Sequence, residues 1–521
     1  MSDTSTAEAQ KNLARLVLIA ACLATGVVGY NTTAASTALP AIKSTFDMNA
    51  EMLQWAMNSY LLASAVLVGV MGRLSDLFGK VRVFLAALCI FALGSLSIVL
   101  SSESWLFYVG RVFQGIGAAT IFATSVALLT VVSPEDRRAS ALGLWAAMIA
   151  LGIGVGPVLG GLITDFVEWR VIFVLDLILL AVAIALALRI KMLGGITEAE
   201  HSGERIDYLG AGLLIMTLAS LVFALTHGHR AGWLSPEILG LFATTVIGGA
   251  VFYWAERRAS APLVKFQFFR HPHFLASTFG IFVATFALWG LIYNYNIFVQ
   301  TPDAMGQTAV QAGLTLLPVS AAMFICSVFL PSRLEKYSLH WPVTLGMLCL
   351  ALAAWLLHMV GNNSPYSQIW WKLLIYGLGL GLTIPLLSWL GLRVIPEADS
   401  GQGSGIINTC LYFGGSIGIA ASGVVTAYVR HKAIVEVAGE LNVPDGEVQR
   451  LARELAHGSI SEVRSALASL DPEVAQKAQS VLIDIADDGF NSVMLLLMIV
   501  MIIGAVLCFL LGRGPVLREN K

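Results

Sequence analysis

The stretch LGIGVGPVLGG at residues 151–161 places five glycines and one proline among leucine, isoleucine and valine. Glycine and proline are the poorest helix formers in water. Within a membrane, glycines spaced by four residues let two helix backbones approach closely, and a proline bends the helix. Gly152, Gly156 and Gly160 have this spacing and Pro157 lies among them, which predicts a bent membrane helix packed tightly on a neighbour.

The composition of the whole chain agrees with a membrane protein. Of its 521 residues, 57% are hydrophobic and 12% are charged, and the mean hydropathy is +0.79. Runs of about 20 apolar residues cross a bilayer as helices, whereas β-barrel strands alternate with a period of two. The sequence shows long runs without such alternation. It therefore predicts an all-α integral membrane protein.

Fourteen apolar runs are long enough to be spans. They occupy residues 14–35, 53–72, 83–101, 105–128, 140–163, 171–190, 208–226, 236–256, 273–296, 311–330, 341–360, 369–394, 403–428 and 489–511. Cytoplasmic loops carry an excess of Lys and Arg. With a cytoplasmic N-terminus, the short outer loops hold only Lys43, Arg170 and Arg230. We therefore expect a multi-pass protein of the cell inner membrane with both termini in the cytoplasm.

The sequence gives no sign of an enzyme or of a nucleic-acid-binding protein. All six cysteines fall in apolar runs without metal-ligand spacing, which predicts small buried hydrophobic residues. No His, Cys, Asp or Glu set has catalytic spacing, and no phosphate-binding G-x-x-x-x-G-K-[ST] loop is present. The net charge of −2 comes without a dense basic cluster. We expect no catalytic residues, no metal and no cofactor.

One connection between the spans, at 429–488, is long enough to form a domain outside the membrane. Within it SISE (459–462) is a capping box, and DPE (471–473) supplies an N-cap and a first-turn proline. These signals predict two or three short amphipathic helices, the last running into the final span. The apolar face of that helix either packs on the segment itself or docks a periplasmic adaptor.

Three motifs in one order give a resemblance to a known family. GRLSDLFGKVR (72–82), YVGRVFQGIGAA (108–119) and the stretch at 151–161 resemble the signatures of the major facilitator superfamily. Further pieces resemble its 14-span drug:proton antiporter branch. They are ALPAI (38–42), WRVIF (169–173), DYLG (207–210), AGLTLLP (312–318) and GSGIINTCLYFGGSIGIA (403–420). The resemblance implies two six-helix halves, at 1–190 and 270–521, with an inserted helix pair at 191–269.

The resemblance also assigns gating roles. It places the motif of Gly152, Gly156, Pro157 and Gly160 between the halves, where it would seal the substrate site from one side. In the loop 72–82, glycines allow a tight turn while an acid pairs with nearby cations or with a helix N-terminus, which would latch the cytoplasmic side. The loop residues concerned are Gly72, Arg73, Asp76, Gly79 and Arg82.

Ionisable residues inside a membrane are costly and therefore suggest function. Two stand out, Arg111 in the fourth span and Asp176 in the sixth. Relatives in the branch carry an acid in the first span, where this chain has Asn31, and an asparagine where it has Asp176. The acid that exchanges protons would thus have moved to Asp176, with Arg111 tuning it. The alternative is a water-exposed acid at the outer end of the helix.

A site without an acid in the first span should favour neutral, zwitterionic or anionic molecules over strongly cationic ones. Polar and aromatic residues at helical spacing are the candidates for its walls. They are Tyr30, Asn31, Gln54, Asn58, Arg111, Trp289, Tyr293, Asn296, Asn408 and Tyr412. The aromatic residues at 289–296 are equally compatible with a belt at the membrane interface.

The resemblance and these residues together predict a proton-coupled exporter of small amphipathic molecules that works by alternating access. The direction of transport rests on the resemblance. A dedicated exporter of an endogenous metabolite, such as a siderophore, is the alternative. A membrane-embedded enzyme and a sensor that uses 429–488 as its input are two further classes, and the motifs favour neither.

Overall fold

The structure is a computed structural model. It describes residues 2–194, 196, 207–259, 262–301, 304–329, 340–362, 364–396, 399–440 and 472–513. For some of these it describes the backbone alone, including 2–9, 434–440 and 472–485. Every regular element within these ranges is a helix. Fourteen helical segments are long and apolar enough to cross a membrane, as predicted.

The N-terminal half consists of seven helices. They are α1 (Ser2–Thr37), α2 (Leu39–Thr45), α3 (Ala50–Phe78), α4 (Lys80–Val99), α5 (Ser104–Val132), α6 (Glu135–Phe166) and α7 (Val171–Leu193). Helix α1 packs on α6 and α7, while α5 packs on α3 and α4. Between α3 and α4 the chain turns at the single residue Gly79, whose φ of 93° is open mainly to glycine. The tight turn predicted there is present.

The inserted pair comprises α8 (Tyr208–Ala231) and α9 (Pro236–Glu256), followed by the short 3-10 helix η1 (Phe266–Arg270). Capping explains where the pair begins, because Asp207 accepts a hydrogen bond from the amide of Gly210 and Ser235 accepts one from Ile238. Helix α8 packs on α9 and also contacts α3 and α16, which belong to different halves. The pair is therefore attached through α8.

The C-terminal half contains α10 (Pro272–Gln300), α11 (Ala309–Thr315), α12 (Leu317–Phe329), α14 (His340–Leu357), α15 (Tyr366–Arg393), α16 (Ser400–Glu440) and α19 (Pro472–Leu511). The run predicted as one span at 311–330 is broken at Leu316. Pro318 explains the break, since proline has no N–H for the helix ladder. A capping box of Thr308 and Gln311 starts α11.

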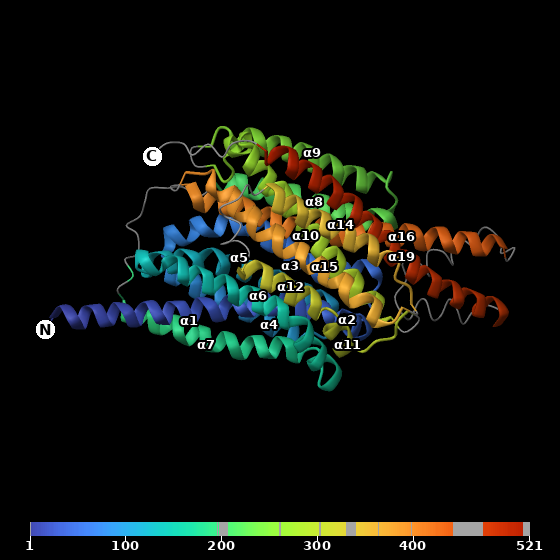
Figure 1. Cartoon of the computed structure of the whole chain (residues 1–521), viewed down its shortest axis with the longest axis horizontal. Coiled ribbons are helices and arrows are strands. Elements are labelled where there is room, and N and C mark those ends of the chain that lie inside the picture. Colours follow the sequence, from blue (N-terminus) through green and yellow to red (C-terminus); the bar gives the residue numbers. More distant parts are fainter. Residues whose placement is uncertain are drawn as a thin grey trace.

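The helices run roughly parallel, with the N-terminus at one end of the bundle and α2 and α11 at the other (Figure 1). We call the end with α2 and α11 the distal face. Helices α16 and α19 project beyond the bundle on this side (Figure 1). Helix α19 begins at Pro472, as the DPE signal predicts. The SISE capping box lies outside the described residues.

The cysteine prediction holds only in part. Cys22, Cys326 and Cys508 are buried, but Cys89 is exposed and Cys349 and Cys410 are partly exposed, and all six are free thiols. Cys89 lies on α4, whose outer surface also exposes leucines. An apolar run in a membrane protein does not separate residues of the core from residues that face lipid.

Candidate functional site

A buried polar network joins the two ionisable residues singled out by the sequence. The side-chain oxygen of Asn31 on α1 accepts a hydrogen bond from Nη1 of Arg111 on α5 at 2.9 Å. The amide nitrogen of Asn31 donates to Oδ2 of Asp176 on α7 at 2.6 Å. All three side chains are fully buried. Asp176 therefore contacts Asn31, which stands where relatives in the branch are expected to carry the acid.

Two further side chains complete this network. Gln114, one helical turn after Arg111, accepts from Nη1 of that residue at 2.8 Å and donates to Oδ2 of Asp176 at 3.4 Å. Ser95 on α4 donates to the same carboxylate oxygen at 3.2 Å and accepts from Gln114 at 2.8 Å. Two amide side chains therefore connect the cation and the carboxylate. We call these five residues the Arg111–Asp176 network.

Arg111 is also held on its other side. Its Nε donates to the carbonyl of Ala56 at 3.1 Å, and its guanidinium lies 4.5 Å from the ring centre of Tyr60. Oδ1 of Asp176 and Nη2 of Arg111 are buried, and neither has a hydrogen-bond partner among the described residues. A buried charge whose partners are incomplete is costly. The carboxylate of Asp176 is therefore only partly satisfied by the described residues.

The glycine stripe of α6 packs against α1 of the same half. A Cβ on Gly156 would clash with Oγ1 of Thr33, and one on Gly160 would lie 2.7 Å from the carbonyl oxygen of Ala34. A Cβ on Gly152 would lie 2.8 Å from the backbone nitrogen of Tyr30. The close backbone approach predicted from the spacing is present, but these three glycines face a helix of their own half and not the other half.

Pro157 and Gly161, one helical turn later, make a contact between the halves. A Cβ on Gly313 of α11 would clash with the carbonyl oxygen of Pro157, and one on Gly161 would lie 2.8 Å from Cα of Val310. The motif therefore lies on a helix at the boundary between the halves, with Pro157 and not the three glycines facing the other half. One face of α6 packs on α1 within its half, and the other face meets α11.

Thr33 compensates for the proline in α6. Pro157 lies inside the helix and has no N–H, so the carbonyl of Ile153 loses its usual donor four residues on. Oγ1 of Thr33 on α1 donates to that carbonyl at 3.1 Å. In an apolar environment a backbone carbonyl needs such a partner. A side chain of α1 therefore satisfies the carbonyl that Pro157 leaves without its helical donor.

The halves are joined at the distal face by polar contacts as well. Asp165, near the end of α6, accepts hydrogen bonds from the backbone amides of Ala309 at 3.1 Å and Val310 at 2.8 Å. These amides belong to the first turn of α11, so the acid lies at the positive end of that helix. Asn296 of α10 donates to Ser36 of α1 at 3.2 Å.

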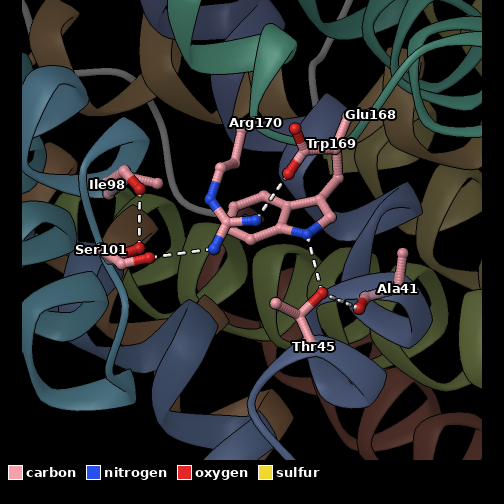
Figure 2. Close-up of polar contacts among 7 residues, drawn as sticks. All are labelled: Ala41, Thr45, Ile98, Ser101, Glu168, Trp169 and Arg170. Carbon is pink, nitrogen blue, oxygen red and sulfur yellow. Dashed lines mark hydrogen bonds and ion pairs between the residues drawn. The ribbon is translucent and has the colours of Figure 1, made fainter.

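A second cluster holds the distal end of the N-terminal half together (Figure 2). Nε1 of Trp169 donates to Oγ1 of Thr45 at 2.9 Å, and Nη2 of Arg170 donates to the carbonyl of Ser101 at 2.9 Å. Arg170 also pairs with Glu168 at 2.5 Å. The WRVIF motif therefore connects α2 to the segment that follows α4, at the entrance to the helix that carries Asp176.

The predicted wall residues fall into two groups. Tyr30 and Asn31 face the interior of the N-terminal half, because the hydroxyl of Tyr30 lies 3.5 Å from the carbonyl of Ile172 and Asn31 belongs to the network. Arg111 belongs to the same network. The others lie in the C-terminal half or on α3, which contacts it. Gln54 and Tyr293 line a cavity at the distal face.

Other wall residues link helices across the two halves or lie within one helix. Asn58 of α3 accepts from Ser416 of α16 at 3.2 Å. The ring of Tyr412 meets that of Phe122 of α5 edge to face, with centroids 6.3 Å apart. Asn408 donates to Ser404 in its own helix at 3.0 Å. These contacts place polar groups of α16 opposite α3 and α5.

Trp289 and Tyr293 are buried, with exposed fractions of 6% and 4%. Residues of an interfacial belt would lie at the lipid boundary, so burial argues against that alternative. Of the gating loop, Gly72 lies inside α3 and not in the turn, which Gly79 makes alone. The side chains of Arg73 and Asp76 lie outside the described residues, and the predicted latch remains a prediction. Arg82 is exposed.

Sequence reasoning missed Gln114 and Ser95. A signal existed for the glutamine, because residues three apart lie on one face of a helix and Gln114 is three residues after Arg111. No pattern marks Ser95, which reaches the carboxylate only through the packing of α4 on α7. Whether Arg111 and Asp176 meet was open in the sequence, and the fold brings them together through Asn31.

Comparison with known proteins gives one family. The family model of the Major Facilitator Superfamily matches residues 21–419. The chain is 30% identical to the multidrug resistance protein Stp of Mycobacterium tuberculosis (strain CDC 1551 / Oshkosh), over 84% of this chain and 80% of that protein. It is 28% identical to the methylenomycin A resistance protein of Bacillus subtilis (strain 168), over 78% of this chain and 87% of that one.

The fold is also similar to that of a solved transporter. A bacterial homologue of the human lysosomal transporter Spinster, solved in an inward-facing and unoccupied conformation, matches with a TM-score of 0.65 at 14% identity, over 96% of this chain and 97% of that chain. These matches define a multi-pass membrane transporter. The chain belongs to the Major Facilitator Superfamily, and its similar proteins include multidrug and antibiotic resistance proteins.

Proposed function

We propose that this protein is a proton-coupled exporter of small amphipathic molecules that works by alternating access. The Arg111–Asp176 network is the observation that carries the proposal. It places one carboxylate, fully buried, among three helices of one half. A titratable group in that position is a functional candidate by default.

Proton binding would change the contacts of α7. When Asp176 is ionised, Oδ2 accepts hydrogen bonds from Asn31 and Ser95. Protonation removes the charge that strengthens these bonds. Helix α1 would then be held less firmly to α7, and α1 also carries the contacts to the glycine stripe of α6. A proton at Asp176 would thereby alter the position of α1, whose Ser36 contacts Asn296 of the other half at the distal face.

The same geometry supports neutral, zwitterionic or anionic substrates. The carboxylate lies on α7 and is bonded to Asn31, while the halves meet where α3 packs on α16 and where α6 packs on α11 and α12. A substrate between the halves would meet amides and aromatic rings such as Asn58 and Tyr412. Strongly cationic molecules would find no buried acid there among the described residues. A dedicated exporter of an endogenous metabolite, such as a siderophore, fits the same wall.

The remaining expectations are proposals of the same kind. We place the distal face outside the cell and both termini in the cytoplasm. The three parts would be 1–190, 191–269 and 270–521. The long connection at 429–488 would be a periplasmic segment and could dock an adaptor. Deleting 441–471 tests this last point, since loss of export with normal membrane insertion would favour docking.

The test of coupling uses inside-out vesicles that contain the protein and are acidified inside. Cationic, neutral and anionic compounds are added in turn, and proton efflux is followed. We expect neutral or anionic compounds to release protons from wild-type vesicles and Asp176→Asn to abolish the release. Glu103→Gln is the matched control, because Glu103 is an exposed acid at the start of α5.

Two results would contradict the proposal. Equal proton release by wild type and Asp176→Asn would mean that another group carries the proton. Equal activity toward strongly cationic dyes and neutral compounds would contradict the substrate class while leaving the coupling group in place.

A further inference from the structure

A cavity of about 100 Å³ lies at the distal face, where α2, α3, α8, α10 and α16 come together. It is the place where the inserted pair touches both halves. A drug-sized molecule needs a pocket of about 300–1,000 Å³, so this cavity accommodates only a small group. Its lining combines apolar residues with several cations, whereas the groove beside Trp55, Leu62 and Val66 is almost wholly apolar.

The positive charges come from different parts of the chain. Lys43 belongs to α2 of the N-terminal half, Arg430 to α16 of the C-terminal half and Arg230 to the end of α8. The acid in the lining, Glu51, already contacts His227 at 2.7 Å and Arg230 at 3.6 Å. The fold thus brings Lys43 and Arg430 to one small cavity beside an acid that is engaged with α8.

The two cations affect each other. Burial and the nearby guanidinium of Arg430 lower the pKa of Lys43 to about 8, against a smaller opposing effect of Asp47. Two like charges in a confined, partly desolvated place are costly. An anion between them would offset this cost.

A neutral side chain also points to a ligand. Gln54 lines the cavity with 6% of its surface exposed, and its side-chain oxygen is buried without a partner among the described residues. A carboxamide can turn by half a rotation and present its NH2 group. Tyr293 supplies a hydroxyl to the same lining.

We propose that this cavity is a binding site for an oxyanion group, a carboxylate, sulfate or phosphate, held between Lys43 and Arg430. The anion joins the two halves on the distal side and is released when that side opens. This site goes beyond the proposed function, because binding needs neither proton coupling nor transport. The group can belong to an exported molecule, a soluble ion or a lipid head group.

The first test measures sulfate binding by titration calorimetry. The full chain is placed in phosphatidylcholine nanodiscs at constant ionic strength, with chloride as the replaced anion. We expect saturable binding to wild type and about tenfold weaker binding to Lys43→Met and to Arg430→Gln, since each removes one charge-assisted contact. Arg258→Gln, an exposed cation stacked on Trp254, should bind as wild type does.

A second measurement needs no variant. Sulfate keeps its charge between pH 7 and 9, so a change in affinity there reports on the protein. The titratable and charged groups that face Lys43 are Asp47, Glu51, His229, Arg230, Tyr293 and Arg430. Because Lys43 loses its proton near pH 8, we expect roughly fivefold weaker binding at pH 9 than at pH 7.

The lipid arm identifies the source of the anion. Nanodiscs with phosphatidylglycerol should weaken sulfate binding if a lipid head group occupies the cavity, and should leave it unchanged if the ligand is soluble. Both results support the site. Absence of saturable binding in wild type, or equal binding by wild type and both cavity variants, would overturn it. An affinity that does not change between pH 7 and 9 would overturn the role of Lys43.

Discussion

The side chain of Asn31 lies between Arg111 and Asp176 and hydrogen-bonds both, at 2.9 Å and 2.6 Å. An amide can do this because it offers an acceptor and a donor on one carbon. The hydrogen bond between the two positions can form whichever of them carries the acid, because Asp and Asn have nearly the same shape, although Oδ2 of Asp176 also accepts from Ser95 and Gln114. This exchange of roles gives a sharp test.

The double substitution Asn31→Asp with Asp176→Asn moves the acid to α1 and keeps the hydrogen bond between the two positions. We expect the double variant to recover substrate-driven proton release that Asp176→Asn alone loses, because Arg111 then contacts the carboxylate directly. The measurement is the vesicle assay described above. A double variant as inactive as Asp176→Asn would show that the acid acts only from α7.

Gly156→Ala should destabilise the protein. The added Cβ would clash with Oγ1 of Thr33 and lie 2.8 Å from the carbonyl oxygen of Tyr30, so α6 and α1 must separate. Overpacking of this kind costs about 1–3 kcal/mol, and thermal unfolding in detergent measures it. Gly143→Ala on the same helix meets nothing within 4 Å and serves as the control. Helix propensity alone would stabilise both variants, so a Gly156→Ala protein as stable as Gly143→Ala would mean that the close packing on α1 does not decide.

Thr33→Val should cost about 1 kcal/mol, because the carbonyl of Ile153 loses its donor. The cost depends on Pro157. In a Pro157→Ala background the helix supplies an N–H to that carbonyl, and the same threonine change should cost much less. A double-mutant cycle on unfolding free energies measures this coupling. Additive effects would show that Thr33 and Pro157 act independently.

The sequence predicts the fold well because its signals are local. Runs of apolar residues set the fourteen spans, and the DPE signal marks where α19 begins. Asp207 and Ser235 cap α8 and α9, whose spans were predicted from their apolar runs alone. The break at Leu316 was missed, although Pro318 carried the signal. Apolar runs and capping residues act within one segment, so a single sequence is enough to recognise them.

The site is predicted less completely because its contacts join distant segments. Arg111 and Asp176 were recognisable as charges inside apolar runs, but the sequence does not say that Asn31 joins them over separations of 80 and 145 residues. The partner of the glycine stripe was also open, since spacing predicts a close approach without naming the helix that approaches. In the sequence, nothing distinguishes Lys43 and Arg430 from other cations near the ends of spans. Only the fold brings them to one cavity.

Lys43 should make stability depend on pH in a particular direction. Its pKa is about 8 in the folded protein and lies near 10.5 when the side chain is free. Between these values the unfolded chain binds more protons, so the free energy of unfolding rises with pH. The penalty is fully present below pH 8 and disappears as pH approaches 10.5. Thermal unfolding of wild type should therefore improve relative to Lys43→Met from pH 8 to 10, and a constant difference would contradict this.

Asp165→Ala should favour opening of the distal face. The change removes two hydrogen bonds to the first turn of α11 and the attraction between a carboxylate and a helix N-terminus, which is worth about 1 kcal/mol in total. A difference of this size shifts an equilibrium between closed and open forms about fivefold. Spin labels at Leu162 and Leu314, both exposed, report the distance between α6 and α11. We expect a larger fraction of long distances in the variant. Glu103→Gln is the control, and an unchanged distance distribution in Asp165→Ala would mean that the backbone contacts of Pro157 and Gly161 hold the distal side closed by themselves.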